Sequence, residues 1–332
     1  MLLAHGAGGR KSADLIHDVF LRHFSNPALD VLGDSAILST SAARLAFTTD
    51  AFVVSPLFFP GGDIGKLAVC GTVNDLACSG ATPLALSAAF ILEEGLDIAI
   101  LERIVVSMRD AAAEAGVSIV AGDTKVVPRG SADQVFITTS GVGLIPVGLT
   151  PPSPDRAAPG DVVLLTGPIA DHGMAVMTAR EGLRLGSEIR SDCAPLAGLA
   201  AALLNAAPDV HALRDPTRGG LAAVLNEIAD QSGVCIEIDE AAVPVNEDVR
   251  VVCELLGIDP LHVANEGKLV AIVPPDEADA ALAALRGHPY GAGAAIVGRV
   301  QDGPSGRVHL RTVLGSLRLL DLPSGDLLPR IC

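Results

Sequence analysis

The feature that most constrains the fold is a proline-rich segment near the middle of the chain. Five prolines, at positions 146, 151, 152, 154 and 159, fall within residues 146–159. Proline lacks a backbone N–H and fixes φ, so neither a helix interior nor a central strand continues through such a segment. We therefore predict two domains, residues 1–145 and 161–320, with a linker at 146–160 and a tail at 321–332.

Strand and helix patterns alternate in both halves, which indicates an α/β or α+β fold. The 332 residues are 49% hydrophobic and include 35 glycines and 22 prolines, as expected for compact domains rich in turns. In the first half we predict strands at Arg44–Thr48, Leu84–Leu92 and Val117–Ala121, and helices at Ser12–Phe24, from Ile64 to a stop at Gly80, and at Asp97–Ala115. In the second half we predict helices at Asp171–Glu181, Pro195–Ala206, Arg218–Gln231, Glu247–Leu256 and Pro275–Leu285, and strands at Val162–Thr166, Val234–Ile238, Leu269–Val273, Ala294–Val300 and Arg307–Thr312.

The charge and the cysteines exclude several classes of protein. A formal charge of −16 argues against nucleic acid or an anionic membrane as a partner, because both need a basic face. The N-terminus has no signal-peptide pattern and no apolar run reaches the length of a membrane span, so we expect a cytoplasmic protein. The six cysteines form no CxxC pair, and we expect reduced core thiols without a disulfide framework or structural zinc.

Four aspartates suggest a magnesium site. Asp34, Asp50 and Asp123 follow or precede predicted strands, and Asp75 stands among apolar residues of a predicted helix. Mg²⁺ is typically held by a few carboxylates together with substrate phosphates. A capped turn is the commoner explanation for each aspartate at a strand end, and a solvent-facing Asp75 would need no explanation.

The start of the predicted helix at Ile64 has the features of a phosphate site. Gly61 and Gly62 form a turn, Asp63 is placed to cap the helix, and Lys66 falls in its first turn. The Walker A spacing is absent, so this is not a P-loop. Asn74, like its neighbour Asp75, is polar on an otherwise apolar helix.

Three motifs in the second half are further candidates. His172 at a helix start could meet a phosphate or simply cap the turn. Arg214 and Arg218 flank another helix start and could clamp an anion or form an ion pair that holds the turn. Glu266 precedes a strand and is a candidate base or an ordinary surface charge.

The chain ends on a thiol, Cys332. Chain ends fray unless they are tied down, and an extended tail of residues 321–332 could span roughly 40 Å, enough to carry its sulfur into a pocket and out again. Arg330 would favour the thiolate, whereas the terminal carboxylate opposes it. The alternative is an incidental, solvated cysteine.

Taken together and in this order, the motifs resemble the HypE family of hydrogenase maturation factors, which are ATP-using enzymes of the aminoimidazole ribonucleotide synthetase-like (PurM-like) superfamily. The resemblance covers essentially the whole chain. The motifs that carry it are His5-Gly-x-Gly-Gly9, Thr48-Thr-Asp50, Pro56 to Gly65, Gly71 to Ala77, Gly122 to Val127, Asp171-His-Gly173, Ser191 to Leu196, Arg214 to Gly220, Ala264 to Lys268 and Pro329-Arg-Ile-Cys332.

The resemblance implies a fold and a reaction. It implies an N-terminal domain that forms a homodimer through its sheet, a C-terminal α/β domain, and ATP near the dimer interface. The carbamoyltransferase HypF would place a carbamoyl group on Cys332, and ATP with Mg²⁺ would drive loss of water to a protein thiocyanate. Cyanide would then pass to iron on a HypC–HypD scaffold complex.

The resemblance also implies roles for single residues. It assigns Asp34, Asp50, Asp75 and Asp123 to metal and phosphates, and Lys125 and Glu266 to proton transfer beside the sulfur of Cys332. It places Gly61, Gly62, Asp63, Lys66 and Asn74 by the nucleotide. It implies that His172 and Arg218 bind phosphate or take part in closing a loop over the site. Relatives often carry a second aspartate where this chain has Ser35.

Two other functions remain open from the residues alone. One is an ATP-dependent small-molecule kinase or synthetase on the same fold, which would turn over a free substrate without Cys332. The other is a non-enzymatic carrier in which Cys332 binds a metal or a partner, and which would hydrolyse no ATP.

Overall fold

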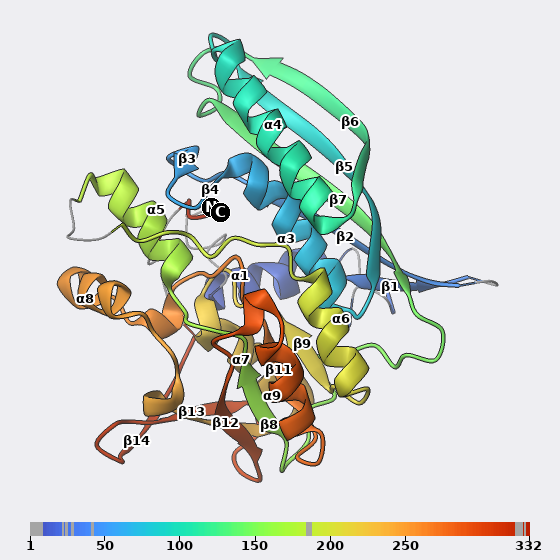
Figure 1. Ribbon diagram of the computed structural model, residues 1–332, viewed down its shortest axis with the longest axis vertical. Helices are drawn as coiled ribbons and strands as arrows, with labels where there is room; N and C mark the ends of the chain where they lie inside the picture. The colour runs from blue at the N-terminus through green and yellow to red at the C-terminus, as the bar shows by residue number, and fades with distance from the viewer. Residues whose placement is uncertain are drawn as a thin grey trace.

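A computed structural model describes residues 9–21, 23, 26–27, 30–40, 43–183, 188–322, 328 and 330–332. Figure 1 shows one mixed α/β layer structure in each half of the chain, the first half above the second. The predicted motif at His5 and the end of the predicted helix at Phe24 lie outside the described residues. Within them, the N-terminal segment forms α1 (Arg10–Leu15) and a π-helical turn, η2 (Ile16–Leu21).

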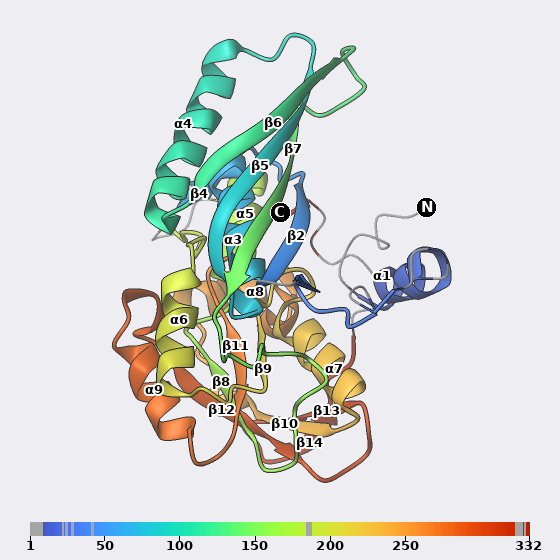
Figure 2. The ribbon, with the colours of Figure 1, turned by 90° about the vertical axis from the view of Figure 1, so that its right-hand side faces the viewer.

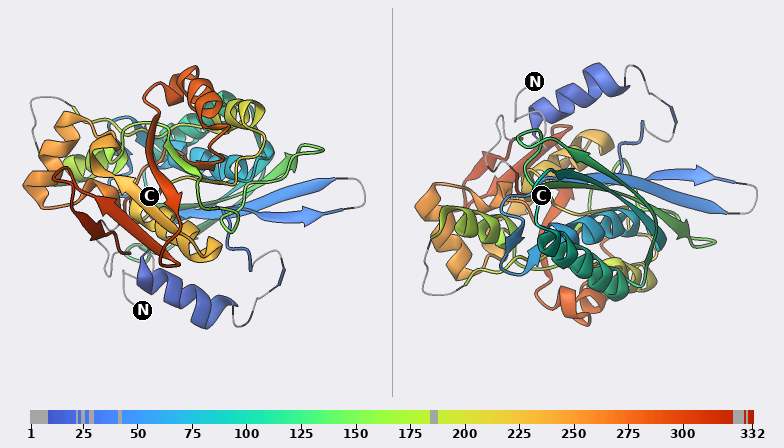
Figure 3. Two further views of the ribbon diagram at one scale, coloured as in Figure 1. Left: turned by 90° about the horizontal axis from the view of Figure 1, so that it is seen from below. Right: turned by 90° about the horizontal axis from the view of Figure 1, so that it is seen from above.

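The first half contains a five-stranded sheet in the order β1-β2-β7-β5-β6. Its strands are β1 (Ala36–Ser39), β2 (Arg44–Phe52), β5 (Thr82–Glu93), β6 (Ser118–Val127) and β7 (Val135–Ile145). Only β5 and β6 run parallel, joined by α4 (Ile98–Ala115). α3 (Ile64–Cys78) and α4 lie on one face of the sheet (Figure 2), and the β1–β2 hairpin projects from the body of the protein (Figure 3).

α3 is the central element of the molecule. A short hairpin, β3 (Phe58–Phe59) with β4 (Gly62–Asp63), leads into it, and the Asp63 carboxylate caps it by accepting from the backbone N–H of Gly65 at 2.7 Å. Nearly every α3 residue is buried, because the helix contacts its own sheet and also α6 (Ala197–Ala206) of the second domain. α3 therefore holds its polar residues at the domain junction.

The second domain is built on a seven-stranded sheet in the order β14-β13-β10-β12-β8-β11-β9. Its strands are β8 (Val162–Leu165), β9 (Ala212–Arg214), β10 (Cys235–Asp239), β11 (Val270–Val273), β12 (Ala295–Gln301), β13 (Arg307–Arg311) and β14 (Leu317–Leu319). Besides α6, its helices are α5 (Asp171–Glu181), α7 (Gly220–Ser232), α8 (Glu247–Leu256) and α9 (Ala278–Arg286), with short 3₁₀ turns η3 (Glu240–Ala242), η4 (Pro260–His262) and η5 (Pro289–Gly291). Separate apolar cores lie under α7 and under α6 with α9.

The predicted mixed α/β fold is confirmed, and α5 and α8 have the predicted bounds. Two predicted strand ends are wrong. β2 continues to Phe52 because it pairs residue by residue with β7, and β6 continues to Val127 beside β5. Asp50 and Asp123 therefore lie inside strands, not beyond their ends.

In the described part of the chain, no helix combines the length and the apolar character that crossing a membrane requires.

Candidate active site

The C-terminus is docked between the two domains, beside α5 and the β3–β4 hairpin (Figure 1). Val53 donates its N–H to the carbonyl oxygen of Cys332 at 3.1 Å, and Ser55 donates to that of Arg330 at 3.2 Å. The Ile331 side chain is buried in the core of the first domain. The last residues are therefore tied down, and Cys332 itself is half-buried.

The Cys332 thiol faces Glu266 and Arg218. Burial raises its pKa well above the ordinary value, the charge of Glu266 and a hydrogen bond to that carboxyl raise it further, and Arg218 opposes the shift. The predicted effect of Arg330 on the thiol is not seen, because the Arg330 guanidinium instead pairs with Asp133. In the docked state the sulfur is a neutral thiol.

Glu266 is a buried carboxyl group, only 3% exposed. Its pKa is raised well above the ordinary range by burial and then by Asp215 and Asp50, while Arg218 lowers it. One carboxyl oxygen, Oε1, has no hydrogen-bond partner in the described structure. A carboxyl group with a raised pKa beside a reacting atom is suited to general acid–base chemistry.

Asp192 holds the Glu266 loop in place. The Asp192 Oδ1 accepts the backbone N–H of Glu266 at 3.1 Å, and its Oδ2 accepts from Nζ of Lys268 at 3.0 Å. Both side chains of that ion pair are largely buried. The segment that contains Asp192 therefore fixes where the Glu266 carboxyl points.

A cluster of carboxylates lies next to Glu266. Asp34, Asp50, Asp75 and Asp215 come from four segments: the turn before β1, strand β2, helix α3 and the turn after β9. The pKa of Asp75 is raised well above its usual value by burial, then by the charges of Asp215, Asp50 and Asp34. Burial, followed by the charge of Asp34, raises the pKa of Asp215 to about 8 despite Arg214.

This cluster fits a divalent cation. The Oδ2 of Asp34 is buried without a hydrogen-bond partner among the described residues, and ligand atoms of Asp34, Cys78 and Asp215 lie within 4.8 Å of one another. Several buried carboxylates that raise one another's pKa are stabilised by a cation, and oxygen donors suit Mg²⁺. Asp215 was not among the predicted ligands, although its motif was recognised as an anion clamp.

Hydroxyl groups orient the cluster. Thr48 Oγ1 lies 2.7 Å from Oδ2 of Asp75, as a donor to it. Ser35 donates to the backbone carbonyl of Asp75 at 2.9 Å. Gly71 leaves room for the cluster, since a Cβ there would lie 2.9 Å from the Phe52 ring and 3.3 Å from Oδ2 of Asp50.

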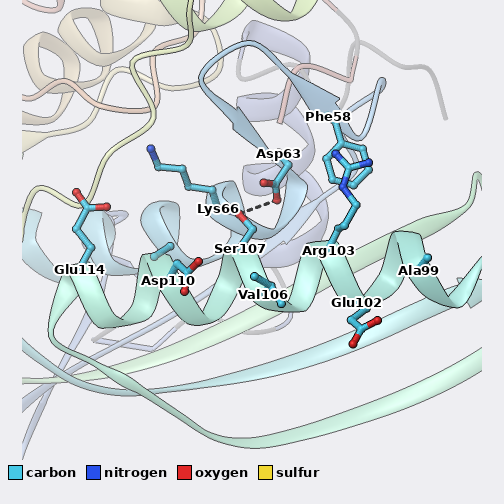
Figure 4. Close-up of a pocket in the computed structure, with 11 residues that line it drawn as sticks. Phe58, Asp63, Lys66, Ala99, Glu102, Arg103, Val106, Ser107, Asp110 and Glu114 are labelled. Carbon is cyan, nitrogen blue, oxygen red and sulfur yellow. Dashed lines mark hydrogen bonds between the residues drawn. The ribbon is translucent and has the colours of Figure 1, made fainter.

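The residues predicted near the nucleotide lie along α3. Lys66 borders a groove of about 780 Å³ beside α4, and Figure 4 shows its side chain extending away from Asp63, toward the end where Glu114 lies. Gly61 (φ +92°) and Gly62 precede the helix. A Cβ at Gly61 would fall 2.6 Å from the carbonyl oxygen of Ser191, so this glycine permits close backbone contact between the domains.

Asn74 links the domains. Its side-chain Nδ2 donates to the carbonyl of Ala194 at 3.1 Å, and its Oδ1 accepts the N–H of Leu196 at 2.7 Å. The amide is buried and engaged with protein backbone. The structure thus gives Asn74 a positioning role at the junction.

Asp123 and Lys125 are not brought to this site within one chain. They lie on the edge strand β6 and form an exposed ion pair of 2.7 Å. Following the strand pairing from β2 through β7 and β5 to β6, Asp50 lies in register with Gly122, the residue before Asp123. Asp123 is therefore three strand spacings from Asp50, or about 14 Å. Asp123 also points to the opposite face of the sheet, because neighbouring residues alternate.

His172 and Arg218 do lie at the site. The pKa of Arg218 is raised, first by Cys332, which is a thiolate at the high pH where an arginine titrates, and then by the nearby Asp50 and Glu266. His172 is fully buried, with Nε2 2.9 Å from the carbonyl oxygen of Ile331. Its contact is therefore the backbone of the tail.

The family models for the N-terminal and C-terminal domains of AIR synthase related proteins match residues 32–145 and 158–311. Carbamoyl dehydratase HypE of Rhodobacter capsulatus is 54% identical over 332 residues, covering 99% of this chain and 97% of the relative. Carbamoyl dehydratase HypE of Escherichia coli K12 is 49% identical over 335 residues, covering 99% and 98%.

Solved structures agree. The HypE chain of a HypE–HypF complex has a TM-score of 0.88 and 52% identity, covering 93% of this chain and 99% of that one. HypE in complex with ATP has a TM-score of 0.85 and 52% identity, covering 100% and 99%. Thiamine monophosphate kinase of Aquifex aeolicus shares the fold alone, with a TM-score of 0.67 and 19% identity.

Proposed function

The chain belongs to the HypE family of AIR synthase related proteins, and on that premise we propose that it is an ATP-dependent carbamoyl dehydratase of [NiFe]-hydrogenase maturation. Its substrate is a carbamoyl group on its own Cys332. The observation that carries this proposal is the docked Cys332 thiol, which is hydrogen-bonded to the buried Glu266 and flanked by Arg218.

The chemistry needs a leaving group and a base. An amide oxygen leaves poorly, so ATP phosphorylates the oxygen of S–C(=O)–NH₂, releasing ADP and giving S–C(–OPO₃)=NH as one N–H proton is lost. Removal of the second N–H proton expels phosphate and leaves S–C≡N. In this proposal Glu266, in its deprotonated form, accepts a proton beside the sulfur, and Arg218 balances the negative charge there; the nearness of both groups to Cys332 supports these roles.

Mg²⁺ would be held by the carboxylates of Asp34, Asp50, Asp75 and Asp215, with the nucleotide phosphates as further ligands. When bound, the ion offsets the negative charge of the phosphates. Lys66 and the α3 start line the groove proposed for the nucleotide. We also expect Asp63 and the Gly61-Gly62 turn to contact the nucleotide, and this remains a prediction.

We further propose a homodimer in which Asp123 and Lys125 serve the site of the partner subunit. α3 and α4 cover one face of the sheet (Figure 2), and the strand register puts Lys125 and four exposed apolar side chains on the other face. These are Leu38, Phe47, Ile91 and Leu144. Covering this face with a second copy would bury them and bring the exposed Asp123–Lys125 pair to a neighbouring site.

The proposed partners are the carbamoyl donor HypF and a HypC–HypD scaffold as cyanide acceptor. A solved relative in complex with HypF supports the first. The HypC–HypD complex and a cytoplasmic location remain predictions.

Mass spectrometry of the C-terminal peptide tests the function. After incubation with the carbamoyltransferase, carbamoyl phosphate and Mg-ATP, Cys332 should gain the mass of one carbamoyl group and then lose one water, the second step only with ATP. Cys332→Ala should show neither change. If wild type and Cys332→Ala consume ATP equally and Cys332 stays unmodified, a small-molecule kinase or synthetase is the better explanation.

A further inference from the structure

The proposed reaction requires the tail to dock for dehydration and to leave for carbamoylation, and the structure shows what holds it. We propose that Arg180, His172 and Asp133 form a latch that positions Cys332 against Glu266 by gripping the two preceding residues of the tail. This inference rests on the proposed function and adds positioning residues to it. Arg180 and His172 lie eight residues apart on α5, whereas Asp133 belongs to the first domain.

Arg180 joins the tail to both domains. Its Nη2 donates to the carbonyl oxygen of Arg330 at 2.7 Å, and its Nε donates to that of Ser55 at 2.8 Å. The same Arg330 carbonyl also accepts the N–H of Ser55. One tail carbonyl is thus held by a charged donor from the second domain and a backbone donor from the first.

His172 holds the next carbonyl along the tail. The Ile331 carbonyl oxygen can only accept a hydrogen bond, so Nε2 of His172 carries the ring proton and donates to it at 2.9 Å. Burial lowers the pKa of His172, so the ring is neutral and Nδ1 accepts from the Ser191 hydroxyl, 2.8 Å away. The Ser191 oxygen in turn accepts the N–H of Cys193 at 3.1 Å. The Phe59 ring lies nearly perpendicular to the imidazole, 5.4 Å between centroids, and keeps it in this orientation.

The Arg330 side chain gives the latch its sequence preference. Arg330 has a left-handed backbone conformation (φ +54°). The guanidinium forms an ion pair with Asp133, donates from Nε to the carbonyl of Val53 at 2.9 Å, and lies 6.0 Å from the centre of the Phe136 ring. A planar guanidinium satisfies all three contacts, so the latch selects arginine at this position.

The parts of the latch differ in strength. His172 acts on a backbone carbonyl at a buried position and Arg180 on one at a part-buried position, and Arg180 is a charged donor, which strengthens its hydrogen bond. The Arg330 and Asp133 side chains are 31% and 47% exposed, so their ion pair is screened by solvent. The main hold is therefore on the backbone, and release requires α5 and residues 53–55 to part.

The test measures how fast the Cys332 thiol of the full-length protein reacts with iodoacetamide, without ATP or partner, by mass spectrometry of each cysteine peptide. Arg180→Met should raise the rate at Cys332 roughly tenfold, because it removes two hydrogen bonds from a charged donor. Asp133→Asn should raise it only about twofold, as expected for an exposed pair. Arg180→Lys should recover part of the protection. Arg109→Met, on the exposed side of α4, is the matched control and should match the unmodified protein.

Cys70 and Cys193, buried in the first-domain core, report on the fold in the same samples. An unchanged Cys332 rate in Arg180→Met, with both core cysteines protected, overturns the proposal. If Arg180→Met exposes the core cysteines, that variant has lost its fold, and Asp133→Asn and His172→Gln are compared with wild type instead. If Cys332 reacts at the wild-type rate in both of these variants, the proposal is overturned. Thiol protection needs no carbamoyl chemistry, so a failed dehydration assay with intact protection would reject the function and not the latch.

Discussion

At the scale of single residues, Glu266 carries the most specific chemical prediction. Glu266→Gln keeps the shape of the side chain but cannot accept a proton, so conversion of pre-carbamoylated Cys332 should slow by roughly 10²–10⁴-fold. Folding stability should not fall, because a buried acid becomes a neutral amide. Single-turnover mass spectrometry of the tail measures the rate. Glu254→Gln, at an exposed position on α8, is the control, and a normal rate in Glu266→Gln would remove the base assignment.

Asp171 predicts a pH dependence of stability. Burial raises its pKa to about 6 from 3.8, with Asn246 opposing the shift through a hydrogen bond. The folded state therefore binds more protons than the unfolded state between these values, so this group's contribution to stability falls as pH rises from about 4 to 6. Asp171→Asn should be more stable than wild type by about 3 kcal/mol at pH 7 and equal to it near pH 3. Urea unfolding at several pH values checks this, and a constant difference across pH would contradict it.

At the scale of elements, Asp63 at the start of α3 has two candidate roles, the N-cap of the helix and a contact with the nucleotide. As the N-cap it accepts from the N–H groups of Gly65 and Lys66, at 2.7 and 3.2 Å. Asp63→Ala should lower the free energy of unfolding by about 1 kcal/mol, whereas Asp63→Asn, which can still cap, should change it little. ATP titration of Asp63→Asn separates the roles. Unchanged ATP affinity assigns Asp63 to the cap, and weakened affinity assigns its charge to the nucleotide site.

The strands show where local patterns fail. Helices α5 and α8 could be bounded from sequence because each ends at a glycine with a left-handed backbone, Gly182 and Gly257. β7 was not predicted, because Gly141 and Gly143 interrupt its apolar alternation. A Cβ at Gly141 would meet the Thr72 side chain at 2.7 Å, so this glycine is explained by tertiary packing against α3. Such a requirement is not visible within the strand's own sequence.

At the scale of the whole molecule, the predicted residues divide into two groups. Asp34, Asp50 and Asp75 converge with Glu266 because β2, α3 and the second domain meet at the tail. Asp123 and Lys125 do not join them, since strand order in the sheet, which the sequence does not reveal, places β6 at the far edge. Asp215 was not predicted as a metal ligand, because in the sequence alone its motif is equally consistent with an ion-paired turn. Only the structure shows the other carboxylates beside it. The site of one chain therefore lacks the predicted second proton acceptor.

That division makes the proposed dimer testable by complementation. Glu266→Gln and Lys125→Met should each be nearly inactive as homodimers. If Lys125 serves the partner subunit's site, mixing the two variants under subunit exchange should restore about one quarter of wild-type activity, because half of the dimers are mixed and each has one intact site. If Lys125 acts within its own chain, every site carries one substitution and mixing restores nothing. A third mixture with Phe47→Asp added to both variants controls for assembly: the charge on the proposed interface should abolish the recovery, since a site shared between chains exists only where the two sheets meet.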